Sequence, residues 1–196
     1  TVKLRYRSLE RSLLKVTKLS QQPISENLQK LMFTEFKAAA KEADLLIFSD
    51  FNYGCLPQSL VANISKFAKE RGIMIAADSQ SSSQYGDISR YQGANLITPT
   101  EHEARLALQN YDDGLVVLAD KLMKKTFSDN ILLKLGPDGL IAQCQNQTDK
   151  RPHTEKLDAL NANPKDVSGA RDSMLATASL ALMSGANLWE ASLLGN

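Results

Sequence analysis

Two short, uninterrupted apolar runs that each end in an acidic residue constrain the fold of this chain most strongly. Residues 45–48 (LLIF) run into Ser49 and Asp50, and residues 73–77 (IMIAA) run into Asp78. A strand with one face in water alternates apolar and polar side chains, whereas a strand covered on both faces is apolar throughout. Both runs therefore predict central strands of a parallel sheet that helices cover on each face.

Amphipathic segments lie between the apolar runs. Ser25 is a predicted helix cap before an apolar stripe at Leu28, Leu31 and Phe36, and Pro57 opens a second such segment. Further strands are predicted at 95–98, 131–135 and 140–144. A short helix is predicted to start at Thr100, further helices at 115–123, 169–184 and from 187 onward, and mostly loop at 145–164. Parallel strands joined by right-handed crossovers place helices on both sides of a sheet. The prediction is an α/β fold, a three-layer α/β/α sandwich with a mostly parallel sheet.

The carboxyl ends of the predicted strands carry polar residues. Asp50, Asp78, residues 98–100 and Gly136 each follow an apolar run. Because ligands of such sheets bind beyond the carboxyl ends of the strands, we expect these residues to lie near one another at a binding edge.

The first residues predict a different element. Val2, Leu4 and Tyr6 alternate with basic residues, which indicates a strand with one dry and one wet face, and a second strand is predicted at 12–19. The basic residues here are interpreted as a solvated face in preference to a phosphate-binding surface.

Composition narrows the class of protein. The chain has 196 residues with 23 Lys plus Arg against 22 Asp plus Glu, a net charge of +1, which argues against a nucleic-acid-coating protein. No apolar run approaches the length of a membrane helix. Cys55 and Cys144 lie far apart, so reduced thiols in a cytoplasmic protein are expected.

Residues 166–172 (DVSGARD) lead directly into an apolar helix and are the sharpest local pattern. A turn of small residues at a helix start can bind an anion through backbone N–H groups, and Asp172 could accept a proton there. The alternative is purely structural, with Ser168 as the helix cap and Asp172 as an ordinary first-turn acid. These residues alone leave both interpretations open.

The same segment resembles the C-terminal signature Asp-x-Thr/Ser-Gly-Ala-Gly-Asp of the PfkB (ribokinase-like) carbohydrate kinases. In the same order, residues 49–54 (SDFNYG), 91–104 (YQGANLITPTEHEA) and 135–139 (LGPDG) are similar to the heptose-phosphate kinase branch of that family. The opening residues 2–5 resemble the strand before the central half of these kinases. The resemblance implies a ribokinase-like fold that phosphorylates a sugar or sugar-phosphate hydroxyl with ATP and Mg²⁺.

The resemblance also implies roles for residues of the transfer site. Asp172 would take the hydroxyl proton, and the N–H groups of Gly169, Ala170 and Arg171 would form an anion hole. Asp50, at a strand end, would reach the substrate region.

A second group of residues would hold the nucleotide. Gly136 and Gly139 would let the backbone approach it closely, with Thr100 and Lys134 beside them. Glu103 would help to hold Mg²⁺ and phosphate through water. Thr100 and Glu103 also have the spacing of a capping box, which needs no ligand.

Several residues depart from the family pattern. Arg171 replaces a glycine, Tyr53 and Gln80 replace lysines, Thr100 replaces an asparagine and Lys134 replaces a threonine. These departures motivate an alternative hypothesis, a degenerate ribokinase-like protein that binds a nucleotide or a partner without transferring phosphate.

The extent of the resemblance leads to a further expectation. Residues 1–196 correspond to the C-terminal two-thirds of one kinase domain, without the N-terminal segment that supplies the sugar site and the lid. We therefore expect exposed apolar strand surface, and a homodimer is one way to cover it. The expected ligand is a small sugar, not a nucleic acid or a membrane.

Overall fold

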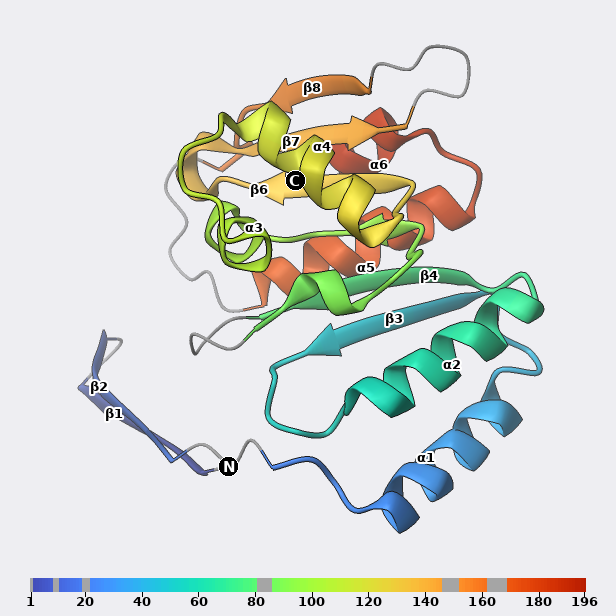
Figure 1. Cartoon of the computed structure of the whole chain (residues 1–196). Helices are drawn as coiled ribbons and strands as arrows, with labels where there is room; N and C mark the ends of the chain where they lie inside the picture. Colours follow the sequence, from blue (N-terminus) through green and yellow to red (C-terminus); the bar gives the residue numbers. More distant parts are fainter. Residues whose placement is uncertain (1, 9–10, 19–21, 81–85, 146–151, 162–168) are drawn as a thin grey trace.

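A computed structural model describes residues 2–8, 11–18, 22–80, 86–145, 152–161 and 169–196. Its main body is a six-stranded sheet with helices on both sides (Figure 1). A separate antiparallel hairpin of β1 (Val2–Ser8) and β2 (Arg11–Lys18) lies beside this body. The hairpin and the main sheet therefore form two distinct pairing units.

The main sheet has the spatial order β3-β4-β5-β6-β7-β8. Its four parallel strands are β3 (Leu45–Asp50), β4 (Met74–Ser79), β5 (Leu96–Ile97) and β6 (Asn130–Lys134). The antiparallel strands β7 (Leu140–Cys144) and β8 (His153–Leu157) extend the sheet on the β6 side. The prediction of a mostly parallel sheet is confirmed for the central part, where the carboxyl ends of four strands meet at one edge.

Two helical layers sandwich the sheet (Figure 1). One layer contains α1 (Glu26–Ala39), α2 (Gln58–Glu70), α3 (Glu101–Leu108) and α4 (Leu115–Thr126). The other contains α5 (Ala170–Met183) and α6 (Leu188–Gly195). Two short 3₁₀ turns, η1 (Ile88–Arg90) and η2 (Gly136–Asp138), lie in connecting segments. The predicted three-layer α/β/α sandwich is confirmed.

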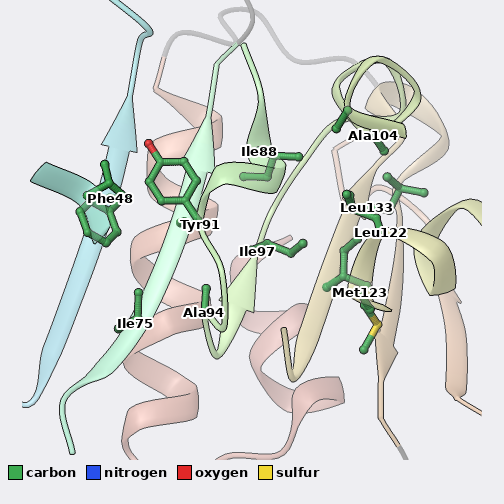
Figure 2. Packing of buried hydrophobic residues seen from close by; sticks show 14 of the residues in the cluster. Phe48, Ile75, Ile88, Tyr91, Ala94, Ile97, Ala104, Leu122, Met123 and Leu133 are labelled. Atoms are coloured by element: carbon green, nitrogen blue, oxygen red, sulfur yellow. The ribbon is translucent and has the colours of Figure 1, made fainter. Parts of the chain in front are cut away.

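Alternate residues of the central strands pack into different cores. Ile75 and Ala77 of β4 contact the cluster under α2 to α4, whereas Ala76 between them belongs to the cluster under α5 and α6. Figure 2 shows the first cluster, in which Phe48 and Tyr91 lie side by side with ring centroids 5.1 Å apart. Because side chains alternate across a strand, an uninterrupted apolar run fills both cores at once.

The helix starts follow local sequence signals. Ser25 accepts a hydrogen bond from the backbone N–H of Leu28 at 3.4 Å, as predicted for a cap. Thr100 with Glu103, and Asn187 with Glu190, form complete capping boxes at the starts of α3 and α6. Each box satisfies two N–H groups that would otherwise have no partner in the first turn.

Two sequence predictions need correction. Residues 145–164 were predicted as mostly loop, but they include β8, an edge strand whose polar sequence HTEKL carries no apolar periodicity. The hairpin was predicted to have a dry face, yet Val2, Leu4 and Tyr6 are all exposed. No helix or sheet of the described chain covers this face, which matches the expectation of exposed apolar strand surface.

Both cysteines are free thiols. Cys144 is half-buried on β7, and this burial raises the pKa of its thiol, whereas Cys55 is exposed and not packed. Among the described residues, no helix combines the length and the apolar character needed to span a bilayer.

Candidate active site

The predicted polar residues meet at the carboxyl edge of the parallel strands. Asp50 ends β3, Asp78 lies at the corresponding end of β4, and Thr98 follows β5. Gly136 comes two residues after β6, where Thr100 and Lys134 form an additional bridge. The topology therefore brings together residues that are up to 86 positions apart in sequence, from Asp50 to Gly136.

Asp172 lies in the first turn of α5, directly above this edge. Gly169 occupies the cap position with φ of +80°, a conformation that glycine adopts without a steric penalty, and none of the described side chains caps the helix. The Oγ of Ser49, on β3, donates a hydrogen bond to Oδ1 of Asp172 at 3.1 Å. The side chain of Asp172 is otherwise exposed, so it is accessible to a ligand at the strand ends.

The start of α5 differs from the structural interpretation of the sequence. That interpretation used Ser168 as the cap, whereas Gly169 holds this position. Residues 166–168 of the motif lie outside the described residues. The first N–H groups of a helix have no partner inside the helix, so those of α5 can bind an anion.

An ion pair connects the two helical layers across the strand ends. The Nη1 of Arg171, on α5, lies 3.3 Å from Oε1 of Glu103, on α3. Glu103 is 2% exposed, while the Arg171 side chain is 45% exposed. The second Glu103 oxygen, Oε2, accepts the backbone N–H of Thr100 at 2.7 Å, so both oxygens of this carboxylate are already engaged.

A second ion pair at the strand ends is buried. The Nζ of Lys134 donates to Oδ1 of Asp78 at 2.7 Å, and the hydroxyl of Thr98 donates to the same oxygen at 3.2 Å. Oδ2 of Asp78 is buried without a hydrogen-bond partner in the described structure. Burial raises the pKa of Asp78, and Lys134 opposes that shift.

One pocket is lined by three of the residues predicted to bind the nucleotide. It has a volume of about 370 Å³ and is lined by Thr100, Glu101, His102, Arg105, Lys134, Leu135 and Gly136. Gly136 has φ of +66° and open space where a Cβ would lie. Gly139 is not among the lining residues, and a Cβ at its position would clash with the backbone of residues 157–159, at the end of β8 and just after it. Gly136 therefore faces the pocket, while Gly139 lets two parts of the chain approach each other.

Asp50 is held by a buried network. Its Oδ1 accepts the backbone N–H of Asn52 at 2.9 Å, and its Oδ2 accepts the hydroxyl of Tyr91 at 2.9 Å. Arg90 Nη1 lies 3.3 Å from the same Oδ2. Asp50 also lines a separate pocket of about 280 Å³ with Asn52, Gly54 and Arg90 among its walls. The raised pKa of Tyr91, caused by burial and by Asp50, keeps its hydroxyl protonated as a donor.

Sequence reasoning missed the partners that hold these residues. Ser49, Thr98 and Tyr91 are the donors to Asp172, Asp78 and Asp50, and the sequence predictions include none of these pairings. One signal was available for the buried ion pair. Lys134 interrupts the apolar run 131–135, and a lysine inside a covered strand requires a buried carboxylate partner.

The described chain is an α/β protein in which a helix that starts after Gly169 stands at the carboxyl ends of parallel strands, the place where such folds commonly bind anions. The pfkB family of carbohydrate kinases matches residues 11–196, and this chain belongs to that family.

Curated relatives share the whole length of this chain but extend well beyond it. The chain is 28% identical over 200 residues to the bifunctional protein HldE of Paramagnetospirillum magneticum. It is 30% identical over 199 residues to the bifunctional protein HldE of Desulfatibacillum aliphaticivorans. Both alignments cover 100% of this chain and 39% of the relative, so the chain spans about two fifths of their length.

Solved structures show the same fold. Phosphofructokinase-2 from Escherichia coli, in complex with substrates and products, superimposes with a TM-score of 0.73 and 16% identity. That match covers 95% of this chain and 58% of the other. Ribokinase from Thermotoga maritima gives a TM-score of 0.64 at 18% identity, covering 87% of this chain and 52% of the other. The fold is therefore ribokinase-like, as expected.

Proposed function

We propose that this chain transfers the terminal phosphoryl group of ATP to a hydroxyl of a sugar or sugar phosphate. Membership of the pfkB carbohydrate kinase family supports the reaction class. The resemblance of residues 49–54 and 91–104 to the heptose-phosphate kinase branch supports a heptose phosphate as the first acceptor to test. The observation that carries the proposal is the exposed Asp172 carboxylate in the first turn of α5, at the carboxyl edge of the parallel strands.

The chemistry assigns one role to this carboxylate. The acceptor hydroxyl gives its proton to Asp172 while its oxygen bonds to the γ-phosphorus of ATP. The bond from the γ-phosphorus to the bridging oxygen breaks, and ADP leaves with that electron pair. The hydrogen bond from Ser49 fixes the direction of the carboxylate, which favours an aligned proton transfer.

Backbone groups at the same turn would stabilise the transferred group. The N–H groups of Gly169, Ala170 and Arg171 belong to the start of α5, where no side chain of the described ranges competes for them. The helix dipole adds an attraction for negative charge at this end. In phosphoryl transfer, positioning and charge neutralisation supply most of the rate enhancement.

The pocket beside β6 is the candidate nucleotide site. Gly136 presents its backbone to the pocket with open space above it, and Lys134 contributes a positive charge at the wall. Thr100 lines the same pocket while its hydroxyl caps α3. Asp50 lines a different pocket, so we assign it to the acceptor side of the edge.

The described residues do not fit a directly bound Mg²⁺ at Glu103. One oxygen of Glu103 accepts from Thr100 and the other pairs with Arg171. No group of three His, Cys, Asp or Glu side chains in the described ranges could hold a metal ion. The proposed reaction steps are therefore assigned to residues of this chain alone.

The Arg171–Glu103 pair also favours a second candidate function. A side chain at a position where the family has glycine could exclude productive ATP, leaving a scaffold that binds a nucleotide without transferring phosphate. Calorimetry with ATP separates the two functions, because the second predicts binding with no release of ADP. Recovery of turnover in Arg171→Gly would identify a damaged kinase.

A panel of sugars and sugar phosphates, assayed by ADP release, tests the proposal. The panel contains heptose 7-phosphate, fructose 6-phosphate and ribose, and it is run on the protein and on Asp172→Asn. Loss of a general base lowers turnover by roughly 100-fold to 10,000-fold, so this loss is expected for Asp172→Asn. Because Asp172 is exposed, the variant should keep its fold, which circular dichroism checks.

Asp112→Asn is the matched control, since Asp112 is an exposed acid on the loop after α3. It should turn over at the rate of the unmodified protein. Equal turnover in Asp172→Asn and in the control would rule out Asp172 as the base. ATP binding by calorimetry, together with no ADP release for any sugar, would favour the binding function over the kinase.

A further inference from the structure

Three basic side chains lie around the proposed nucleotide site, and they differ in how firmly they are held. Arg105 donates to Glu101 through Nε and Nη2, at 2.8 and 2.7 Å, and through Nη1 to two backbone carbonyls. Lys134 is 8% exposed and pairs with the buried Asp78. The donors of Arg105 and the ammonium of Lys134 are thus largely committed to the protein itself.

Arg171 is the exception. Its side chain is 45% exposed, and in the part of the chain that the structure describes its guanidinium bonds to one group, Oε1 of Glu103. A guanidinium has five N–H donors in a planar fork, a geometry that matches phosphate oxygens. Within the described residues, most of the donors of Arg171 have no partner and are open to a ligand.

The position of Arg171 directs these donors toward the transfer site. Arg171 precedes Asp172 in the first turn of α5, and its pairing with α3 carries the guanidinium across the carboxyl ends of the strands. Glu103 is fixed from the other side by the backbone N–H of Thr100. A buried, immobilised carboxylate thus orients the guanidinium that it holds.

On the basis of the proposed function, we propose that the Glu103–Arg171 couple binds the terminal phosphate of ATP. Arg171 stays on Glu103 and uses its remaining donors for phosphate oxygens, so the buried carboxylate never loses its counter-ion. The couple supplies positive charge where Glu103 would otherwise have a free oxygen for a divalent cation. Triphosphate binding by this chain is consequently independent of Mg²⁺.

This arrangement explains a group of departures from the family pattern. Tyr53 and Gln80 stand where the resemblance has lysines, and Arg171 stands where it has glycine. The chain thus lacks two cations that follow β3 and β4 and has a guanidinium in the first turn of α5. The substitution at 171 is therefore a relocated phosphate-binding charge and not an obstruction.

Calorimetric titration with β,γ-imido-ATP and with ADP, each with Mg²⁺ or with EDTA, tests the proposal. The protein should bind β,γ-imido-ATP with nearly equal affinity in both buffers. Arg171→Gly should weaken β,γ-imido-ATP binding in EDTA by about tenfold or more, the loss typical of a charge-assisted hydrogen bond. ADP binding should change little, because ADP lacks the phosphate that Arg171 contacts.

Three further variants control the measurement. Arg71→Gly makes the same change at the exposed C-terminal end of α2 and should bind like the unmodified protein. Arg171→Lys keeps the charge but loses the fork, and an intermediate affinity is expected. Glu103→Gln keeps an amide oxygen for Thr100 but removes the orienting charge, so it should also weaken β,γ-imido-ATP and spare ADP. If Arg171→Gly fails to fold, Arg171→Lys and Glu103→Gln carry the test.

Two outcomes would overturn the inference. One is β,γ-imido-ATP binding that requires Mg²⁺ in the unmodified protein. The other is unchanged affinity in EDTA for every folded variant of Arg171 and Glu103. Mg²⁺-independent binding without ADP release would reject the proposed kinase function and leave this inference standing. ADP release together with Mg²⁺-dependent binding would support the proposed kinase function and reject this inference.

Discussion

Lys134 and Asp78 form a buried ion pair, with 2.7 Å between Nζ and Oδ1, across the end of the strand that separates them. Lys134 comes from β6 and Asp78 from β4, and β5 lies between these strands. Thr98, which follows β5, donates to the same carboxylate. The pair therefore ties three neighbouring strands together at the edge that carries the candidate site.

Removing the lysine should destabilise the fold strongly. In Lys134→Met the carboxylate of Asp78 keeps its burial and loses its counter-ion, which costs about 3–5 kcal/mol when a buried pair is broken on one side. The free energy of unfolding from urea denaturation measures this loss. The double variant Asp78→Asn/Lys134→Met should recover most of the stability, since neither partner is then charged. Additive losses in the double variant would contradict the coupling.

The stability should also depend on pH through Asp78. Burial raises the folded-state pKa of Asp78 above its ordinary value of 3.8, so the folded state binds this proton more tightly than the unfolded state. The free energy of unfolding contributed by this group is present at low pH and is lost as pH rises through the raised pKa. The double variant has no group that titrates here, so its stability should fall less than that of the unmodified protein from about pH 4 to about pH 7. Parallel curves for the two proteins would disprove the assignment.

The two glycines of the β6–β7 turn should respond differently to alanine. A Cβ at Gly139 would clash with the carbonyl oxygen of Leu157 and lie 2.8 Å from the backbone N of Ala159, at φ of +85°. At Gly136 the space is open, so only the positive φ is penalised, by roughly 1 kcal/mol. Urea denaturation should show Gly139→Ala as the less stable variant. Gly136→Ala should chiefly weaken nucleotide binding, because Gly136 lines the pocket; a reversed order of stabilities would refute this division.

Tyr91→Phe should destabilise the protein without changing its fold. The hydroxyl of Tyr91 is a buried donor to Asp50, at 2.9 Å, and its loss leaves that carboxylate with fewer partners. Losing a hydrogen bond to a buried charged group costs about 1–3 kcal/mol. Thermal unfolding measures the change, and Tyr111→Phe, at an exposed tyrosine, is the control. Equal stability of the two variants would show that the Tyr91–Asp50 bond contributes nothing.

Several features of this protein were predictable because their causes are local. The apolar runs at 45–48 and 73–77 gave buried parallel strands, and the capping pairs Thr100 with Glu103 and Asn187 with Glu190 gave the starts of α3 and α6. The sequence did not predict β8, because an edge strand can be polar throughout and then shows no apolar periodicity. The roles of the site residues, and the place of residues 1–196 as two-thirds of one kinase domain, stay predictions.

The sequence by itself determined which central strands are buried, where the capped helices α1, α3 and α6 begin and which polar residues follow the strands at one edge, because periodicity and capping act over a few residues. Only the tertiary structure decided the partners across that edge. Lys134 pairs with Asp78, Arg171 with Glu103 and Ser49 with Asp172, over separations of 56, 68 and 123 residues. Such pairs depend on the order of strands in the sheet and on the crossing of helical layers, and no local pattern in the chain encodes either.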